Sequence, residues 1–205
     1  MTTRRSSPFW RARHDDAVHQ PGPHDVERWA MEGRSYHMLT DVELEHFTRR
    51  LGVRRGHVAV DVGCGSGVFS RQLYRFGYDV TGLDYAEAAL AAARRTPLPG
   101  VRYLYHDLNE GDPPGLPPHG IDLVVCRLVL PFLDKPYEWV RRVREYWLRP
   151  GGLLYLVVPV VGERAEQPGG MTEYEIAELL HGWGQVVRYE LGGSLACLAL
   201  RSTAT

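Results

Sequence analysis

The chain contains 205 residues, of which an ordinary 44% are apolar, and carries a formal net charge of −1 at pH 7. This length suits a single domain with a sizeable hydrophobic core, and the near-neutral charge argues against a general binder of nucleic acids or membrane surfaces. Because no segment has the pattern of a transmembrane helix or a secretory signal, we expect a cytoplasmic protein that binds neither nucleic acid nor membrane.

The amino-terminal segment is rich in polar residues, arginine and histidine up to about residue 25. Such a composition buries too little apolar surface to order by itself. We therefore predict that residues 1–25 form a flexible tail, or a lid that orders over a ligand. Trp10 and Trp29 are the candidates to line that lid.

Residues 26–205 are predicted to form one domain that opens with a helical segment at 26–52. Apolar side chains recur there at helical spacing, and Thr40 or Asp41 is placed to cap its second half.

Beyond this segment, strand-like and helix-like patterns alternate, which is typical of a parallel, doubly wound α/β sheet. The chain ends with two strand patterns about Gly192-Gly193, which predict a closing hairpin. A loop is expected at 111–119, because its prolines prevent a regular helix. The predicted strands are 58–62, 79–83, 102–106, 122–126, 153–158, Gln185–Leu191 and Ser194–Leu200, and the predicted helices are 67–76, 86–95, 136–147 and a helix near 172–182.

The first predicted strand runs directly into a turn with glycine at every second position: Gly63, Gly65 and Gly67. Glycine lets the backbone turn sharply and approach a ligand closely. Asp61 lies two residues before the first glycine, where its carboxylate would repel the pyrophosphate of a dinucleotide. The third glycine also comes one residue earlier than in the dinucleotide fingerprint, where Val68 stands instead. A ligand that carries an ammonium and a sulfonium, such as S-adenosylmethionine, fits this acid better.

Two more acids end the next two predicted strands. Asp84 follows the glycine turn by about twenty residues, at a position that suits the two ribose hydroxyls of an adenosine. Asp107 ends the third strand, where an aspartate and the following backbone N–H can bind the edge of an adenine ring. Three strands that each deliver an acid at the carboxyl end favour a cationic nucleoside ligand more strongly than the glycine turn does alone.

These motifs resemble those of the class I S-adenosylmethionine-dependent methyltransferases, over the stretch from about His57 to Arg201. The motifs occur in the family order: Asp61–Gly67, Leu83-Asp84, His106–Leu108, Ile121–Cys126 and Leu148–Leu156. The resemblance implies a Rossmann-like seven-stranded sheet in the order 3-2-1-4-5-7-6, with the last strand antiparallel. It also implies S-adenosylmethionine as cofactor and S-adenosylhomocysteine as product.

The same resemblance implies which residues bind the cofactor. Asp84 would hold the ribose, Asp107 and Leu108 the adenine, and Asp61 with the glycine turn the methionine moiety. Cys126 and Arg127 would pass beneath the sulfonium and its methyl group. The full set of expected cofactor contacts is Tyr36, Asp61, Gly63, Cys64, Gly65, Gly67, Asp84, Tyr85, Asp107, Leu108, Cys126 and Arg127.

No catalytic residue follows from the sequence. Methyl transfer is an in-line displacement that needs chiefly positioning and exclusion of water. Many small-molecule relatives have a histidine after the fourth strand, where this chain has Pro131. The remaining candidates are His37, as a base in the amino-terminal segment, and Arg127, which either clamps a substrate anion or pairs with a neighbouring acid. Arg34 is a further candidate to bind the methionine carboxylate.

The sequence therefore favours methyl transfer to nitrogen or oxygen of a small-molecule acceptor, by a monomer or a homodimer. The alternatives are a cyclisation or decarboxylation with the same fold and cofactor, and a non-catalytic cofactor-binding protein. A nicotinamide-dependent oxidoreductase is disfavoured by Asp61 and Val68. The three cysteines, Cys64, Cys126 and Cys197, lack metal-ligand spacing, so we expect free thiols and no metal.

Overall fold

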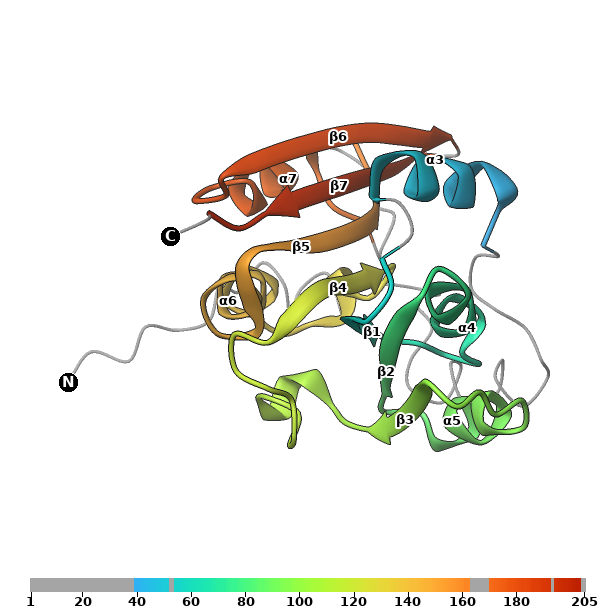
Figure 1. The fold of residues 1–205 in the computed structure, drawn as a ribbon. Coiled ribbons are helices and arrows are strands. Elements are labelled where there is room, and N and C mark those ends of the chain that lie inside the picture. Colours follow the sequence, from blue (N-terminus) through green and yellow to red (C-terminus); the bar gives the residue numbers. More distant parts are fainter. Residues whose placement is uncertain (1–38, 52–53, 163–169, 193, 204–205) are drawn as a thin grey trace.

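A computed structural model describes residues 39–51, 54–162, 170–192 and 194–203 of the chain. These residues form an α/β fold built on a seven-stranded sheet in the order β3-β2-β1-β4-β5-β7-β6, as the family resemblance implies (Figure 1). The strands are β1 His57–Val62, β2 Tyr78–Asp84, β3 Val101–Tyr105, β4 Ile121–Arg127, β5 Leu148–Pro159, β6 Gln185–Gly192 and β7 Leu195–Arg201.

Helices and short turns connect the strands. The helices are α3 Asp41–Leu51, α4 Val68–Arg75, α5 Glu87–Arg94, α6 Pro136–Arg142 and α7 Glu173–Leu179. Two 3₁₀ turns, η1 Leu108–Glu110 and η2 Leu130–Phe132, follow β3 and β4, and a π turn, η3 Val143–Trp147, extends α6. None of the helices in the described part of the chain is long and apolar enough to cross a membrane.

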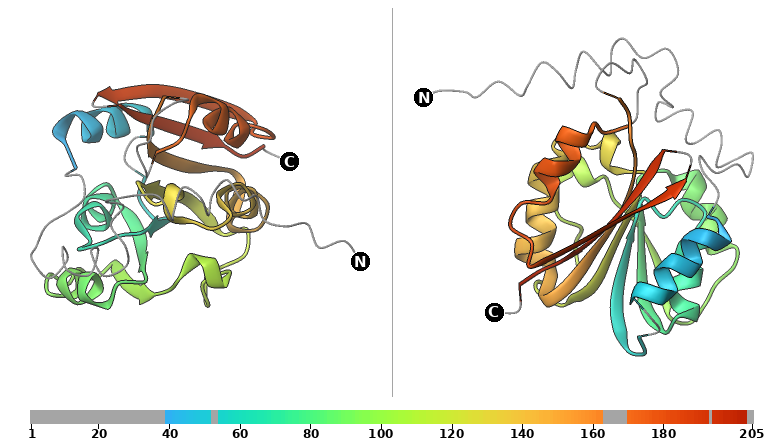
Figure 2. Two further views of the ribbon diagram at one scale, coloured as in Figure 1. Left: turned by 180° about the vertical axis from the view of Figure 1, so that it is seen from behind. Right: turned by 90° about the horizontal axis from the view of Figure 1, so that it is seen from above.

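The first five strands run parallel, and β7 is antiparallel to both β5 and β6. Seen from above, the sheet stands between two helical layers (Figure 2). α3, α4 and α5 cover one face, and α6 and α7 cover the other. Because both faces are covered, the central strands are apolar along their whole length rather than alternating; Val124, Val125 and Cys126 of β4, for example, are fully buried.

Each helical layer contributes its own aromatic anchors to the core. Phe47 of α3 is fully buried and packs edge-on against Phe69 of α4 and Tyr155 of β5, at ring-centre distances of 5.4 and 5.1 Å. On the opposite face Trp139 and Trp147 form an edge-to-face pair with ring centres 5.8 Å apart. Both tryptophans are buried core residues.

Most predicted boundaries agree with the structure to within a residue or two, but the helix expected at 136–147 is only partly α-helical. In a regular helix, an eight-residue separation would rotate Trp147 about 80° away from Trp139. The wider π turn at Val143–Trp147 reduces that rotation, and both rings belong to the same core cluster.

The fifth strand is also longer than the predicted 153–158. Leu148 already pairs with Ile121, and the register between β4 and β5 then shifts before Leu123 pairs with Leu153. Arg149–Gly152 is therefore part of an irregular strand start. In the amino-terminal segment, Thr40 caps α3, since its Oγ1 accepts a hydrogen bond from the Glu43 N–H at 3.2 Å.

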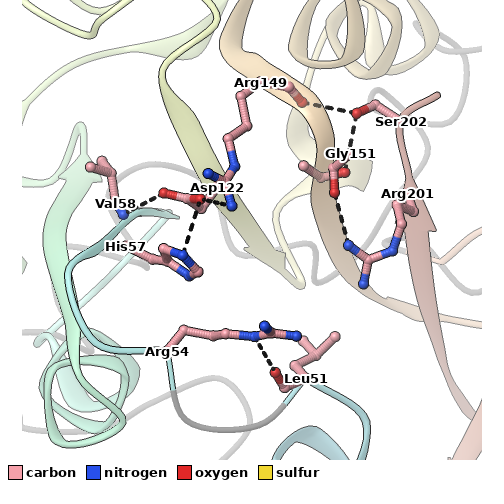
Figure 3. Close-up of polar contacts among 10 residues, drawn as sticks. Leu51, Arg54, His57, Val58, Asp122, Arg149, Gly151, Arg201 and Ser202 are labelled. Atoms are coloured by element: carbon pink, nitrogen blue, oxygen red, sulfur yellow. Dashed lines mark hydrogen bonds and ion pairs between the residues drawn. The ribbon is translucent and has the colours of Figure 1, made fainter. Parts of the chain in front are cut away.

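Asp122 lies at that register shift and joins three strands at the amino-terminal end of the sheet (Figure 3). Its Oδ2 accepts a hydrogen bond of 2.8 Å from the backbone N–H of Val58 in β1. Its Oδ1 forms an ion pair of 2.5 Å with Arg149 of β5, whose side chain is half-exposed. A single carboxylate thus fixes how the ends of β1, β4 and β5 meet.

Two substitutions of Asp122 separate the contribution of the Val58 hydrogen bond from that of the Arg149 ion pair. We expect Asp122→Ala to lower the free energy of unfolding by about 1–3 kcal/mol, because the Val58 N–H loses its acceptor. Asp122→Asn keeps an acceptor oxygen and should cost about 1 kcal/mol or less, since ion pairs with exposed arginines contribute little. Urea unfolding of both variants measures the difference. Equal losses in the two variants would contradict this assignment.

Candidate functional site

The glycine turn after β1 has the backbone conformation that only glycine adopts without strain. Gly63, Gly65 and Gly67 have φ angles of 66°, 54° and 75°. Space is also limiting at two of them. A Cβ on Gly63 would overlap the side chain of Val129, which follows β4, and a Cβ on Gly67 would overlap the phenol of Tyr103 in β3. Residues from β3 and from the turn after β4 therefore pack directly against the glycine turn.

Asp84 holds this turn against the end of β2. Its Oδ2 accepts a hydrogen bond of 2.8 Å from the Gly65 N–H, and its Oδ1 accepts one of 2.9 Å from the Ala86 N–H. The Cys64 N–H also donates to the Leu83 carbonyl at 3.0 Å. Because each carboxylate oxygen can accept more than one hydrogen bond, Asp84 retains the capacity to bind hydroxyl groups of a ligand.

Asp61 is a buried acid, with 2% of its surface exposed. Its pKa is raised to about 7, chiefly by burial. A hydrogen bond of 2.6 Å donated by Ser70 Oγ opposes this rise, the nearby Asp84 adds to it, and the charge of Arg127 opposes it. Near neutral pH this carboxyl is consequently divided between its two protonation states. A cation placed beside it would favour the ionised form.

Asp107 completes a row of three acids along the sheet. It caps η1 and accepts a hydrogen bond of 2.9 Å from the Asn109 N–H. The chain just before it is tied to β2, because the His106 N–H donates to the Asp84 carbonyl at 2.9 Å. Leu108 follows and is half-buried against the core. Asp107, Asp84 and Asp61 therefore come from the carboxyl ends of adjacent strands β3, β2 and β1, as predicted.

β4 forms the other wall of the turn. Cys126 pairs with Val62 and is fully buried, and burial raises the pKa of its thiol, so it stays protonated and is no nucleophile. Leu128 then takes a left-handed conformation with φ of 63°, which is strained for a leucine and directs the chain across Gly63.

Arg127, the last residue of β4, pairs with an acid on α3. Its Nε donates to both carboxylate oxygens of Glu43 at 2.8 and 3.1 Å, and a terminal nitrogen donates to Oε2 at 3.0 Å. Glu43 is 1% exposed. Arg127 was predicted either to clamp a substrate anion or to pair with a neighbouring acid, and in the structure it pairs with the acid Glu43.

Four residues of the site were not identified from the sequence: Glu43, Ser70, Tyr103 and Val129. One signal was available for Tyr103, because Gly82 interrupts the apolar strand β2, and a glycine inside a strand indicates close approach of another group. The Tyr103 ring packs there. The other predicted contacts, Tyr36 and His37 together with Arg34, Trp10 and Trp29, lie outside the described residues.

Known proteins with similar sequences are methyltransferases, which agrees with the row of acids around the glycine turn. Residues 60–156 match the family described as "Methyltransferase domain". A ubiquinone biosynthesis O-methyltransferase of Aeromonas salmonicida is 30% identical over 131 residues, which cover 62% of this chain and 55% of that protein. The chain thus spans about half the length of the curated relatives it matches.

Solved structures share the fold at low sequence identity. A methyltransferase of Haloferax volcanii, in complex with the activator Trm112, has a TM-score of 0.68 at 19% identity and covers 89% of this chain and 98% of its own. The [4+2]-cyclase SpnF has a TM-score of 0.70 at 14% identity and covers 92% and 98%. Since a methyltransferase and a cyclase both share this architecture, the fold alone leaves the reaction open.

The raised pKa of Asp61 predicts a cost to the stability of the ligand-free protein. The unfolded chain releases this proton near pH 4, whereas the folded chain keeps it up to about pH 7. Stability is therefore lost as the pH rises through this window, because the folded state binds the additional proton. Asp61→Asn should exceed the wild type in free energy of unfolding by about 2–4 kcal/mol at pH 8, and by less at pH 5.

Urea unfolding at both pH values measures this difference. Asp79→Asn, an exposed position at the far end of β2, is the matched control and should show no such change with pH. The interpretation fails if Asp61→Asn gains no stability over the wild type between pH 5 and pH 8.

Proposed function

We propose that this chain, whose fold and matched domain fit the class I S-adenosylmethionine-dependent methyltransferases, transfers a methyl group from S-adenosylmethionine to oxygen or nitrogen of a small-molecule acceptor. The observation that carries this proposal is the row of acids around the glycine turn. Asp61, Asp84 and Asp107 lie at the carboxyl ends of three adjacent strands, and Asp61 is buried with a pKa of about 7.

This charge distribution favours one ligand class. Pyrophosphate beside a buried carboxylate would add like charges where water cannot screen them. A ligand with an ammonium and a sulfonium instead supplies the positive charge that the ionised form of Asp61 needs. The residues at the turn therefore fit S-adenosylmethionine and disfavour a nicotinamide dinucleotide.

Within this proposal each acid has its own role. Asp84 accepts hydrogen bonds from the ribose hydroxyls, and Asp107 with the Leu108 N–H binds the adenine edge. The methionine moiety lies along the glycine turn with its ammonium toward Asp61, and the sulfonium faces the exit of β4 at Cys126 and Arg127. Tyr36, Tyr85 and Cys64 complete the proposed contacts.

The cofactor supplies a methyl group activated by a sulfonium, so the protein needs mainly to align the acceptor with the sulfur–methyl bond. The acceptor atom forms a new bond to the methyl carbon while the bond from carbon to sulfur breaks, and S-adenosylhomocysteine leaves. Leu130 and Pro131, in the turn after β4, are buried, and Leu130 belongs to the hydrophobic core.

The residue at position 131 narrows the range of acceptors that the site can methylate. We infer that the acceptor arrives already nucleophilic, as a free amine or an acidic hydroxyl such as a phenol, since Pro131 stands where many relatives have a histidine base. The O-methyltransferase named as a relative supports the oxygen acceptor. His37 remains the candidate base from the amino-terminal segment.

The cofactor assignment is tested by thermal unfolding with either S-adenosylhomocysteine or NAD at the same millimolar concentration. We expect a stabilisation of several degrees with S-adenosylhomocysteine only, because a ligand that binds the folded state stabilises it by an amount that grows with the logarithm of ligand concentration over Kd. Incubation with S-adenosylmethionine and a panel of phenols and amines should then yield S-adenosylhomocysteine. Stabilisation by NAD alone would reject the proposal, whereas product formation without consumption of the methyl donor would favour a cyclisation or decarboxylation.

Asp84 is the sharpest single-residue test. Asp84→Ala removes charge-assisted hydrogen bonds to the ribose, each worth about 1.5–3 kcal/mol, and should weaken S-adenosylhomocysteine binding at least tenfold by calorimetry. Asp79→Ala, which removes an exposed carboxylate from the other end of the same strand, is the control and should bind as the wild type does. Unchanged affinity in Asp84→Ala would overturn the ribose assignment.

A further inference from the structure

The Glu43–Arg127 ion pair is the most buried charged contact between α3 and the sheet in the described residues. The Glu43 side chain is 2% exposed and that of Arg127 13%. Two nitrogens of Arg127 donate to both carboxylate oxygens of Glu43, at distances of 2.8 to 3.1 Å. This bidentate geometry is the strongest arrangement available to the two side chains.

The pair lies at the wall of the proposed cofactor site. Arg127 directly follows Cys126, which pairs with Val62 next to the glycine turn. Val129, two residues further on, packs against Gly63. The charge of Arg127 also reaches Asp61 and lowers the pKa of that buried acid. A positive charge is thus fixed beside the place proposed for a cationic ligand.

Anchoring of α3 does not require this pair. Phe47 of the same helix is fully buried and packs against Phe69, Phe76 and Tyr155. Buried ion pairs are seldom a net source of stability, because removing both charges from water costs about as much as their attraction returns. An apolar contact would hold α3 equally well, so the charges call for another explanation.

We propose that Glu43 is a positioning residue that neutralises Arg127 and directs its guanidinium toward α3, so that the wall behind the sulfonium carries no net positive charge. The inference rests on the proposed function and deepens it. S-adenosylmethionine has a positive sulfur and S-adenosylhomocysteine a neutral one, and the two share their ammonium, carboxylate and adenosine. Glu43 therefore sets the preference of the site for the charged methyl donor over its product.

The ratio of the two affinities isolates this effect. Glu43→Gln keeps an oxygen that accepts from the Arg127 guanidinium but removes the negative charge that Glu43 places beside it. Calorimetry should show that the affinity for S-adenosylmethionine falls by about three- to tenfold relative to that for S-adenosylhomocysteine, as expected for one unit charge in a partly buried site. In turnover, the KM for S-adenosylmethionine should rise more than the inhibition constant of S-adenosylhomocysteine.

Three further variants control this measurement. Arg127→Gln leaves the negative charge in place and should change the ratio in the opposite direction, so it carries the test if Glu43→Gln does not fold. The double variant Glu43→Gln/Arg127→Gln restores neutrality and should return the ratio toward that of the wild type. Glu45→Gln removes an exposed carboxylate of the same helix, paired with Arg49, and should leave the ratio unchanged.

A purely structural role of Glu43 would lower both affinities equally or change only stability. An unchanged ratio in Glu43→Gln and Arg127→Gln, in proteins that bind both ligands, would therefore overturn the inference and leave the proposed function intact. A wild-type protein that binds neither ligand would instead overturn the proposed function.

Discussion

The burial of two carboxylates against a glycine turn is the constraint on which the rest of the site depends. Asp84 accepts the Gly65 N–H at 2.8 Å and so fixes the turn to the end of β2. Burial raises the pKa of this carboxyl, although the N–H groups of Ala86 and Gly65 lower it. Asp61, one strand away, has a pKa of about 7 for the same reason. Two acids kept from water in this way store unfavourable free energy that a cation can relieve.

The sheet positions these acids, and the stability of the surrounding core offsets the free-energy cost of burying them. Parallel pairing brings the carboxyl ends of β3, β2 and β1 side by side, so that side chains far apart in sequence meet at one edge. α3 closes the face next to β4 and β5 through Phe47, and it brings Glu43 to Arg127. The same helix thus supplies both apolar anchoring and the charge that we propose to balance the wall of the site.

The sequence predicted those parts of the fold that local pattern determines. Asp61, Asp84 and Asp107 were found because each ends an apolar strand, and the strand order followed from the family resemblance. The Glu43–Arg127 pair joins positions 84 residues apart, and nothing in the local pattern of either position indicates the other. The π turn before Trp147 and the irregular start of β5 depend on how side chains fill the space between helix and sheet, which periodicity does not describe. The close packing of Tyr103, by contrast, could have been inferred from the glycine at position 82 inside an apolar strand.

Proton release on ligand binding tests most directly whether the pocket is built for a cation. Calorimetry of S-adenosylhomocysteine binding at pH 6, in two buffers of different ionisation enthalpy, counts the protons exchanged. With Asp61 mostly protonated at that pH and ionised by the bound ammonium, we predict release of about one proton per ligand, little release at pH 8, and none in Asp61→Asn. Equal binding enthalpies in both buffers at pH 6 would contradict the assignment of Asp61 as the partner of the ligand's positive charge.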